Sequence, residues 1–215
     1  MILLLSAACA TALPTRPNDR EWTSLWAEYQ TVESLRRVLP QPPPGASRSE
    51  HVEIHLRNQQ RLEPTLAPLL GRLREYHGRT GDPRAARLLA NERIRLGDAY
   101  MSLLARYERA IELYRSALAV DPDNDDARRR LNMAQSRRFV SMDDFASVRA
   151  GMSEREVASR LGTPREDWIK HARQDDRLYS VWIFPREDGG AAAVYFDDGI
   201  VYHVNWNAAA PQPTP

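Results

Sequence analysis

The stretch GMSEREVASRLGTP, residues 151–164, carries the start and stop signals of one short helix. Ser153 is a preferred N-cap residue, and Glu156, three positions later, completes a capping box with it. Gly162 suits the left-handed position just beyond a helix, and the proline two positions later prevents continuation. We therefore expect a helix of about two turns over residues 154–161.

A helix this short is marginal alone, so it must pack on another element. Met152 and Val157 stand at the two positions of a hydrophobic staple, and Val157 and Leu161 give the helix one apolar side. The segment before it, SMDDFASVRAGM, offers Phe145 and Val148 as the apolar residues of another short helix. We expect both helices to cover one face of a small sheet.

The sequence that follows predicts the first strand of that sheet. RLYSVWIFP, residues 177–185, is aromatic and β-branched. Because side chains alternate along a strand, Trp182 and Phe184 are expected on one face and Val181 and Ile183 on the other. The REDGG that comes next is typical of a turn.

A hairpin is predicted further on, in AAAVYFDDGIVYHVNW. The Asp198-Gly199 pair separates two β-rich runs, which is a strong signal for a two-residue hairpin loop. With that loop, Phe196 pairs with Val201, and Val194 shares their face, whereas a slip of one residue would exchange the two faces. The predicted module is two short helices on a three-stranded antiparallel meander.

This order of motifs resembles the BamE (SmpA/OmlA) family of small bacterial lipoproteins. The resemblance covers about a third of the chain, roughly residues 139–207. It implies an outer-membrane protein that stabilises the machine inserting β-barrel proteins and that acts by binding, without catalysis. The same two-helix, three-strand unit recurs in β-lactamase-inhibitor-like domains, so the fold is better specified than the function. The residues that fill the motif are Gly151, Met152, Ser153, Val157, Leu161, Gly162, Pro164, Phe196, Gly199 and Val201.

The N-terminal apolar run ends in LSAAC, residues 5–9, which resembles the lipobox of bacterial lipoproteins, in which the cysteine carries the lipid. Cys9 is the single cysteine of the chain, and lipid on it would hold the protein on a membrane without a transmembrane helix. Ala10 after it resembles the signal for sorting to the outer membrane. The alternatives are an ordinary signal peptide or an apolar terminus with an incidental cysteine.

Helices are predicted between the N-terminus and the module. The first carries Trp22 and Trp26 on an apolar stripe, which either packs in a core or meets a partner or membrane surface. Three consecutive prolines then form an extended linker. Further on, Pro64 and Pro68 are expected near a helix start, because proline is tolerated in the first turn. HGRTGDP is expected to be a turn, with Pro83 opening the next helix.

The segment LGDAYMSLLARYERAIELYRSALAVDPDN resembles a tetratricopeptide repeat. The small residues of the motif would let two antiparallel helices approach closely. We expect a small bundle with one or two repeat-like hairpins, serving either as a groove for a peptide or partner helix or as a structural spacer. The matching residues are Leu96, Gly97, Tyr100, Ala110, Tyr114, Ala117 and Pro122.

Composition and motifs point away from several function classes. The net charge of +1 and the interleaved acids give no basic face for nucleic acid. His51 and His55 have the spacing of half a metal site, but the HExxH order is absent, so we expect no metal and no cofactor. We find no nucleophile elbow, P-loop or reactive cysteine, and we therefore expect no enzyme and no small-molecule substrate.

The expected fold class is α+β, with a helical, repeat-like N-terminal region before the sheet module. The expected function is a lipid-anchored periplasmic scaffold of the outer membrane that binds envelope proteins, among them the β-barrel assembly machinery. The alternatives are an adaptor subunit of another envelope complex (secretion, pilus or motility) and an enzyme inhibitor. The expected partner-binding residues are Tyr100, Tyr107, Tyr114, Trp182, Phe184, Tyr195 and Tyr202. The expected segments are 1–8 signal peptide, 9–17 tether, 18–39 amphipathic helix, 40–48 linker, 49–138 helical region, 139–207 module and 208–215 disordered tail.

Overall fold

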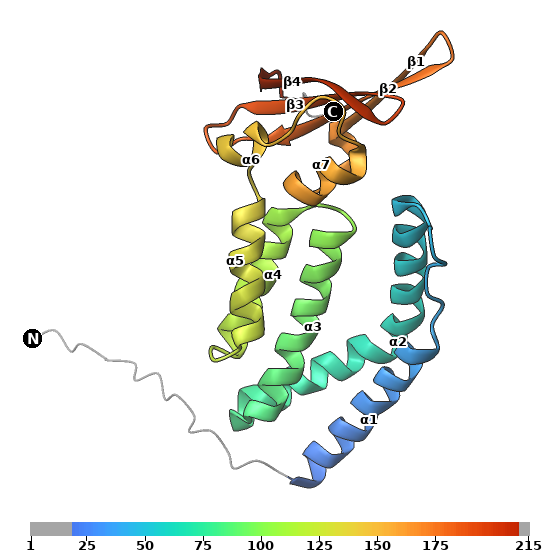
Figure 1. The fold of residues 1–215 in the computed structure, drawn as a ribbon. Helices are drawn as coiled ribbons and strands as arrows, with labels where there is room; N and C mark the ends of the chain where they lie inside the picture. The colour runs from blue at the N-terminus through green and yellow to red at the C-terminus, as the bar shows by residue number, and fades with distance from the viewer. Residues whose placement is uncertain (1–18, 211–215) are drawn as a thin grey trace, which may run out of the picture. The chain divides into compact units, whose positions relative to one another are not determined.

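The computed structural model describes residues 19–210, and within them the chain combines helices with one antiparallel sheet, as expected (Figure 1). The chain divides into two compact units, residues 1–89 and residues 90–215. The boundary falls inside helix α3 (Pro83–Ser102). The predictions of a signal peptide, a lipidated Cys9 and a tether lie outside the described residues, as does most of the predicted tail.

The first unit is built on helices α1 (Asp19–Val38) and α2 (Arg48–Thr80). Leu25, Tyr29 and Val32 of α1 are buried. The two helices run antiparallel, since Arg79 near the end of α2 pairs with Glu21 near the start of α1 at 2.5 Å. The middle of the expected stripe on α1 therefore packs in a core. Trp26, on the edge of the stripe, keeps 41% of its surface exposed.

Helix α2 corrects the prediction for the two prolines. Pro64 and Pro68 lie inside a helix of 33 residues rather than near its start. The start lies upstream, where Ser47 and Glu50 form a capping box. Each proline removes one backbone donor from the helix, and α2 changes direction partway along its length in Figure 1. The bend is how the helix accommodates residues that would otherwise end it.

The turn predicted over HGRTGDP is shorter in the structure, because α2 continues through Thr80 and only Gly81 and Asp82 link it to α3. Gly81 has the left-handed φ of +65°, and Asp82 caps α3 by accepting the Arg84 backbone N–H at 2.9 Å. The Tyr76 hydroxyl donates to the other Asp82 oxygen at 2.8 Å, and Asp82 is only 2% exposed. Hydrogen bonds from Arg84 and Tyr76 to the carboxylate lower the pKa of the Asp82 carboxyl group to about 2. They outweigh the effect of burial, which alone would raise this pKa. Pro83 opens the helix as expected.

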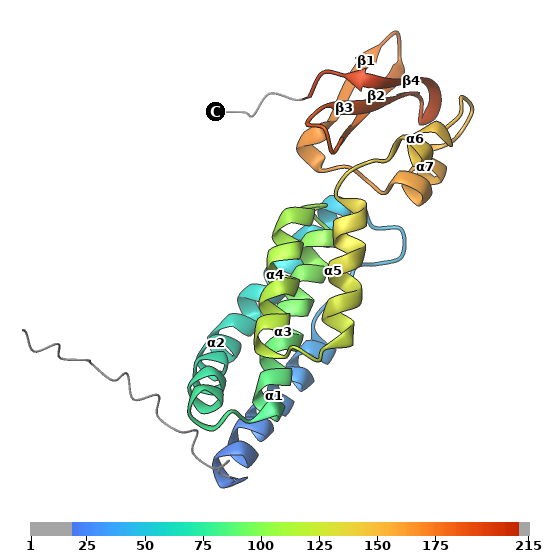
Figure 2. The same cartoon turned by 90° about the vertical axis from the view of Figure 1, so that its left-hand side faces the viewer.

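The second unit begins with the end of α3, followed by helices α4 (Tyr107–Val120) and α5 (Asp125–Arg137). Figure 2 shows α4 and α5 side by side. A Cβ placed on Gly97 of α3 would lie 2.6 Å from Cε1 of Tyr114, so only glycine permits this approach of α3 to α4. The buried residues of this core are Ala90, Ile94, Ala110, Ile111, Tyr114, Ala117, Ala127 and Ala134. Small residues therefore do hold these helices close together, as the repeat-like motif predicts.

A sheet with two short helices on one face completes the second unit. In Figures 1 and 2, helices α6 and α7 lie on the same side of the sheet. The strand order is β1-β2-β3-β4, and each neighbouring pair is antiparallel. The elements are α6 (Met142–Ala146), α7 (Glu154–Leu161), the 3-10 helix η1 (Glu166–Trp168), β1 (Ile169–Gln174), β2 (Arg177–Pro185), β3 (Ala191–Asp197) and β4 (Ile200–Ala208).

The sheet has four strands, so the prediction of a three-stranded meander is wrong in this respect. The additional strand, β1, has the sequence IKHARQ and is exposed along nearly its whole length. As an edge strand without a buried face, it has no apolar alternation to reveal it. Its link to β2 is the two-residue turn Asp175-Asp176, with φ of +49° and +63°. Both values belong to the left-handed region, which aspartate tolerates better than most residues.

Helix α7 has the predicted bounds, and Ser153 and Glu156 form the predicted capping box. Gly162 differs from the expectation, with φ of +79° but ψ of 177°. This is an extended conformation at positive φ, available essentially to glycine alone, and not the left-handed helical one. The chain therefore leaves α7 extended toward Pro164, which is buried.

The segment that opens α7 also closes the sheet. Gly151 donates its N–H to the Val201 carbonyl at 2.8 Å, and Val201 donates to the Met152 carbonyl at 2.8 Å. Glu154 donates its N–H to the Gly199 carbonyl at 3.0 Å. The first turn of the helix is thereby fixed to the β3–β4 hairpin, and part of the β4 edge is covered.

The core of the module lies between the sheet and its helices. The β3–β4 loop is the predicted Asp198-Gly199 pair, with Phe196 paired to Val201. Both loop residues have positive φ, as a type I′ turn requires. The buried residues are Phe145, Val148, Val157, Trp182, Phe184, Ala192, Val194, Phe196 and Val201, and Met152, Ala158 and Leu161 pack against them. The predicted faces of β2 and of the hairpin are confirmed.

Candidate functional site

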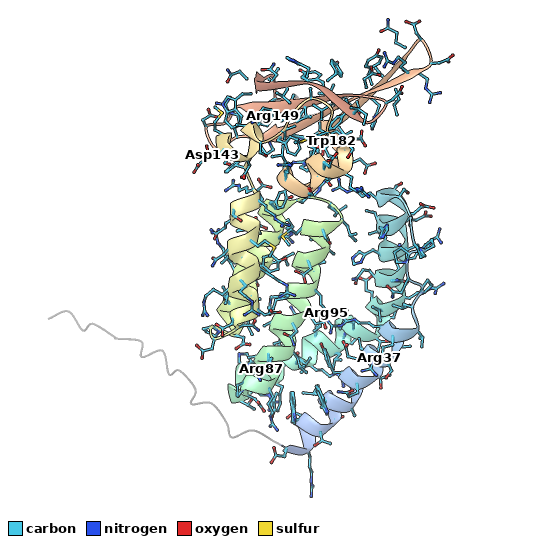
Figure 3. The ribbon with its side chains drawn as sticks, in the orientation of Figure 1. Arg37, Arg87, Arg95, Asp143, Arg149 and Trp182 are labelled. Carbon is cyan, nitrogen blue, oxygen red and sulfur yellow. The ribbon has the colours of Figure 1, made fainter. Side chains whose placement is uncertain are left out.

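Three of the seven expected partner-binding residues are core residues. Trp182 and Phe184 are 7% and 4% exposed and face α6 and α7, and Figure 3 labels Trp182 on that side of the sheet. Tyr114 is fully buried, and its hydroxyl donates to Asp98 at 2.7 Å. Burial, followed by the Asp98 carboxylate, raises the pKa of Tyr114. Expecting Trp182 and Tyr114 at a binding surface is therefore wrong, because the apolar character that suggested it serves packing. Phe184 is also a core residue, but its side chain additionally lines a small pocket described below.

Tyr195 and Tyr202 lie on the opposite face of the sheet, the outer face. Their rings are 6.2 Å apart, and the Tyr202 ring is also 6.3 Å from that of Tyr179. Among residues 90–210, no helix covers this face (Figure 1). We call Tyr179, Tyr195 and Tyr202 the tyrosine patch. Tyr202 is 53% exposed and is the most accessible of the three.

The outer face is apolar around the tyrosine patch. Ile183, Ala191 and Ala193 are buried there although no α-helix lies over them, because larger neighbours shield them. Those neighbours include Trp168 from the 3-10 helix and Val181 from β2. An apolar sheet face that carries aromatic side chains and no covering element is typical of an interaction surface.

A carboxylate stands at the edge of the tyrosine patch. Asp197 is paired with Tyr179 across β2 and β3, and Arg177 binds its Oδ2 at 2.6 Å. The other oxygen, Oδ1, is buried and has no hydrogen-bond partner within the described structure. A buried acceptor without a donor is costly, so a donor from a bound molecule would be stabilised here.

Tyr100 and Tyr107 are half-buried on the helical part of the second unit. Tyr100 packs against the α3–α4–α5 core. Tyr107, at the start of α4, lies next to the end of α7, since a Cβ on Gly162 would be 3.3 Å from its hydroxyl. The structure therefore does not bring the expected aromatic residues into one site: they are divided between two cores, the outer face and the junction of α4 with the module.

That junction contains a pocket of about 140 Å³, which we call the junction pocket. It lies between the α4–α5 helices and the module. The hydrogen bond from the Val140 N–H to the Pro185 carbonyl, 3.0 Å long, lies beside it. Its apolar lining is Ala105, Val140, Leu161, Pro164, Trp168, Phe184 and Pro185. Its polar lining is Tyr107, Glu108, Arg137, Arg138, Thr163 and Arg165.

The motif residues of the GMSEREVASRLGTP stretch have structural roles. Ser153 and Glu156 cap α7, and Gly199 turns the hairpin that receives the capped end. None of them gathers with other polar groups into a reactive site. Across residues 19–210, no group of three or more His, Cys, Asp or Glu side chains could hold a metal ion. Within the same range, no helix is both long and apolar enough to cross a bilayer.

Three residues of these surfaces are absent from the sequence-based expectations. Tyr179 could have been found, because it lies two positions before Val181 and therefore on the same face of β2. Trp168 and Arg137 gave no such signal, because Trp168 sits in a 3-10 turn and Arg137 resembles any charged residue on a solvated helix. Comparisons of the chain with protein-family models, with curated proteins and with solved structures found no match.

Proposed function

We propose that this chain is a lipid-anchored scaffold on the periplasmic side of the bacterial outer membrane, and that it binds a protein partner through the outer face of its sheet. The observation that carries the binding role is the tyrosine patch on that uncovered apolar face. Tyrosine is enriched at protein interfaces because it combines a large apolar ring with a polar hydroxyl.

The envelope setting is supported by the motifs of the sequence. The lipobox-like residues before Cys9 favour an anchored protein, and the BamE-like order of α7 and the β3–β4 hairpin favours a partner from the β-barrel assembly machinery. A partner donor would also satisfy the unpaired oxygen of Asp197 at the edge of the tyrosine patch.

An inhibitor of an envelope or secreted enzyme is the second candidate. Its specific support is the same exposed aromatic sheet face, which could block an active site without contributions from the helices. An adaptor role in a secretion, pilus or motility complex is the remaining alternative. It would also need a membrane anchor and a protein-binding surface on the outer face.

Photocrosslinking tests the proposal on the full chain in its native envelope. A benzoylphenylalanine at position 202 replaces an exposed tyrosine of the patch, and the matched control places it at Glu112, whose side chain is 62% exposed on α4. We expect position 202 to crosslink to a β-barrel assembly component and position 112 to give no such product. We also expect Cys9→Ala to release the chain from membranes.

Each outcome bears on a different part of the proposal. Products that are identical at the two positions would refute binding through the outer face. A specific product with a different envelope protein would refute the assembly machinery as the partner and leave the adaptor. A specific product with an enzyme whose activity falls would favour the inhibitor, and retention of Cys9→Ala on membranes would refute the anchor.

A further inference from the structure

The junction pocket is separate from the tyrosine patch, and the proposed scaffold function does not use it. Its lining combines two kinds of side chain that seldom share a small pocket. Its apolar lining includes the ring of Trp168 and the buried Phe184, and its polar lining includes three arginines and one glutamate. This combination suits a ligand with an apolar group joined directly to an anion.

The size of the pocket limits the apolar group. A volume of about 140 Å³ is close to that of an apolar protein cavity of about 150 Å³ that holds benzene. One aromatic ring or one branched aliphatic side chain therefore fits, but a lipid acyl chain does not. The volume therefore limits the apolar group of a ligand to about the size of one amino-acid side chain.

The arginines differ in how far they are already engaged. Arg138 donates to Glu108 at 3.2 Å, and Arg165 binds Asp167 through two bonds of 3.0 and 2.6 Å. Arg137, the last residue of α5, is exposed and has no ion-pair partner within residues 19–210. Its guanidinium is therefore available for a carboxylate, which it can bind through two parallel hydrogen bonds.

A second, more polar hollow of about 100 Å³ continues from the junction pocket and shares Arg137, Val140 and Leu161 with it. Its lining adds Ser136, Ser159 and Arg160. Hydroxyl and guanidinium groups beside a shared arginine could bind the peptide groups that precede a terminal carboxylate. Taken together, the two hollows are lined by four arginines and only two carboxylates, so their charge favours an anion.

We propose that the junction pocket binds the C-terminal residue of a polypeptide partner. The terminal carboxylate pairs with Arg137, the apolar side chain of that residue enters the junction pocket against Trp168, and the preceding peptide groups lie along the polar hollow. The proposal does not depend on the tyrosine patch, because no residue is shared between them.

The test uses the full chain and two synthetic hexapeptides, both Gly-Ser-Gly-Ser-Gly-Phe, one with a free terminal carboxylate and one amidated. Binding is followed by the indole N–H resonance of Trp168, assigned by its loss in Trp168→Phe. We expect the free acid to shift this resonance saturably and the amide to bind at least tenfold more weakly. A third peptide that ends in serine should also bind at least tenfold more weakly.

Two arginine variants on the same helix separate the site from general charge. Arg137→Gln should weaken binding of the free-acid peptide at least fivefold and leave binding of the amidated peptide unchanged. Arg129→Gln, which removes an exposed arginine that pairs with Asp126 and does not line the pocket, should leave both unchanged. Tyr202→Ser should also have no effect, so that failure of this proposal and failure of the scaffold proposal can be told apart.

Several results would overturn the assignment. Equal affinity for the acid and the amide would show that no carboxylate is recognised. If Arg137→Gln and Arg129→Gln weakened peptide binding equally, binding would depend on the general positive charge of the surface and not on a specific contact with Arg137. Binding to vesicles of an anionic phospholipid that requires Arg137, with no binding of the free-acid peptide, would assign the site to a lipid headgroup and refute a peptide terminus.

Discussion

The packing of Gly97 against Tyr114 gives the sharpest stability prediction. A methyl group on Gly97 would lie 2.6 Å from Cε1 of Tyr114 and 3.0 Å from two further ring carbons. The ring cannot easily move, because it is fully buried and its hydroxyl donates to Asp98. Arg130 holds that carboxylate in turn, with its Nε 2.9 Å from Oδ1.

Two opposing effects determine how much Gly97→Ala changes the stability of the fold. Alanine in place of glycine stabilises a helix interior by about 1 kcal/mol, while forcing extra volume into a packed core costs about 1–3 kcal/mol. We expect a net loss of about 1 kcal/mol. Gly71→Ala is the matched control, since Gly71 is also helical and a Cβ there would meet nothing within 4 Å. That substitution should stabilise the chain by about 1 kcal/mol.

The measurement is native-state hydrogen exchange, because the two glycines lie in different units and each needs a local readout. Amides of α4 should lose protection in Gly97→Ala, and amides of α2 should gain it in Gly71→Ala. The changes in stability caused by Gly97→Ala and Gly71→Ala should differ by about 2 kcal/mol. Because both substitutions gain the same helix propensity, this difference is the steric cost at Gly97. Replacing Tyr114 by leucine should reduce the penalty at Gly97, as expected for two residues in contact.

A contrary result would be easy to recognise. If Gly97→Ala raised the protection of α4 as much as Gly71→Ala raises that of α2, α3 and α4 would not be in close contact at this point. An unchanged penalty in the Tyr114→Leu background would place the strain elsewhere than at this ring.

Two further predictions concern the ends of helices. Gly162→Val should destabilise the module by about 1–3 kcal/mol, because a β-branched residue cannot easily adopt φ of +79° with ψ of 177°; an unchanged melting temperature would contradict the geometry at the end of α7. The buried Asp82 has a folded pKa of about 2 against an ordinary value of 3.8, so its ionised form contributes roughly 2 kcal/mol above pH 3.8. That contribution should disappear as the pH falls from 3.8 toward 2, so Asp82→Asn should destabilise the chain at pH 7 but much less at pH 2 in urea titrations; a pH-independent difference would refute the ionised cap.

Much of the module could be predicted because its signals act over a few residues. Ser153 and Glu156 specify the start of α7 through hydrogen bonds within one turn. Asp198-Gly199 specifies the β3–β4 register because both residues accept positive φ. The alternation in β2 separates its two faces in the same local way.

The candidate sites were predicted less well, because exposure is decided by elements far apart in the chain. Tyr114 and Tyr202 are both tyrosines beside apolar residues, yet one is fully buried and the other is 53% exposed. The difference arises because α3 packs over Tyr114, whereas no helix of the second unit covers the outer face around Tyr202. Sequence patterns report that a side chain is apolar but not which element will cover it.

The sequence by itself therefore determined where α7 and the β3–β4 hairpin begin and end and which side chains of β2 share a face. Hydrogen bonds and backbone torsions of adjacent residues suffice for these features. Tertiary structure alone decided the polar strand β1, the bend of α2 around its prolines, and the junction pocket. Each depends on free energy from packing between distant segments: β1 is held by pairing with β2, and the pocket exists because α4, α5 and the module meet around it.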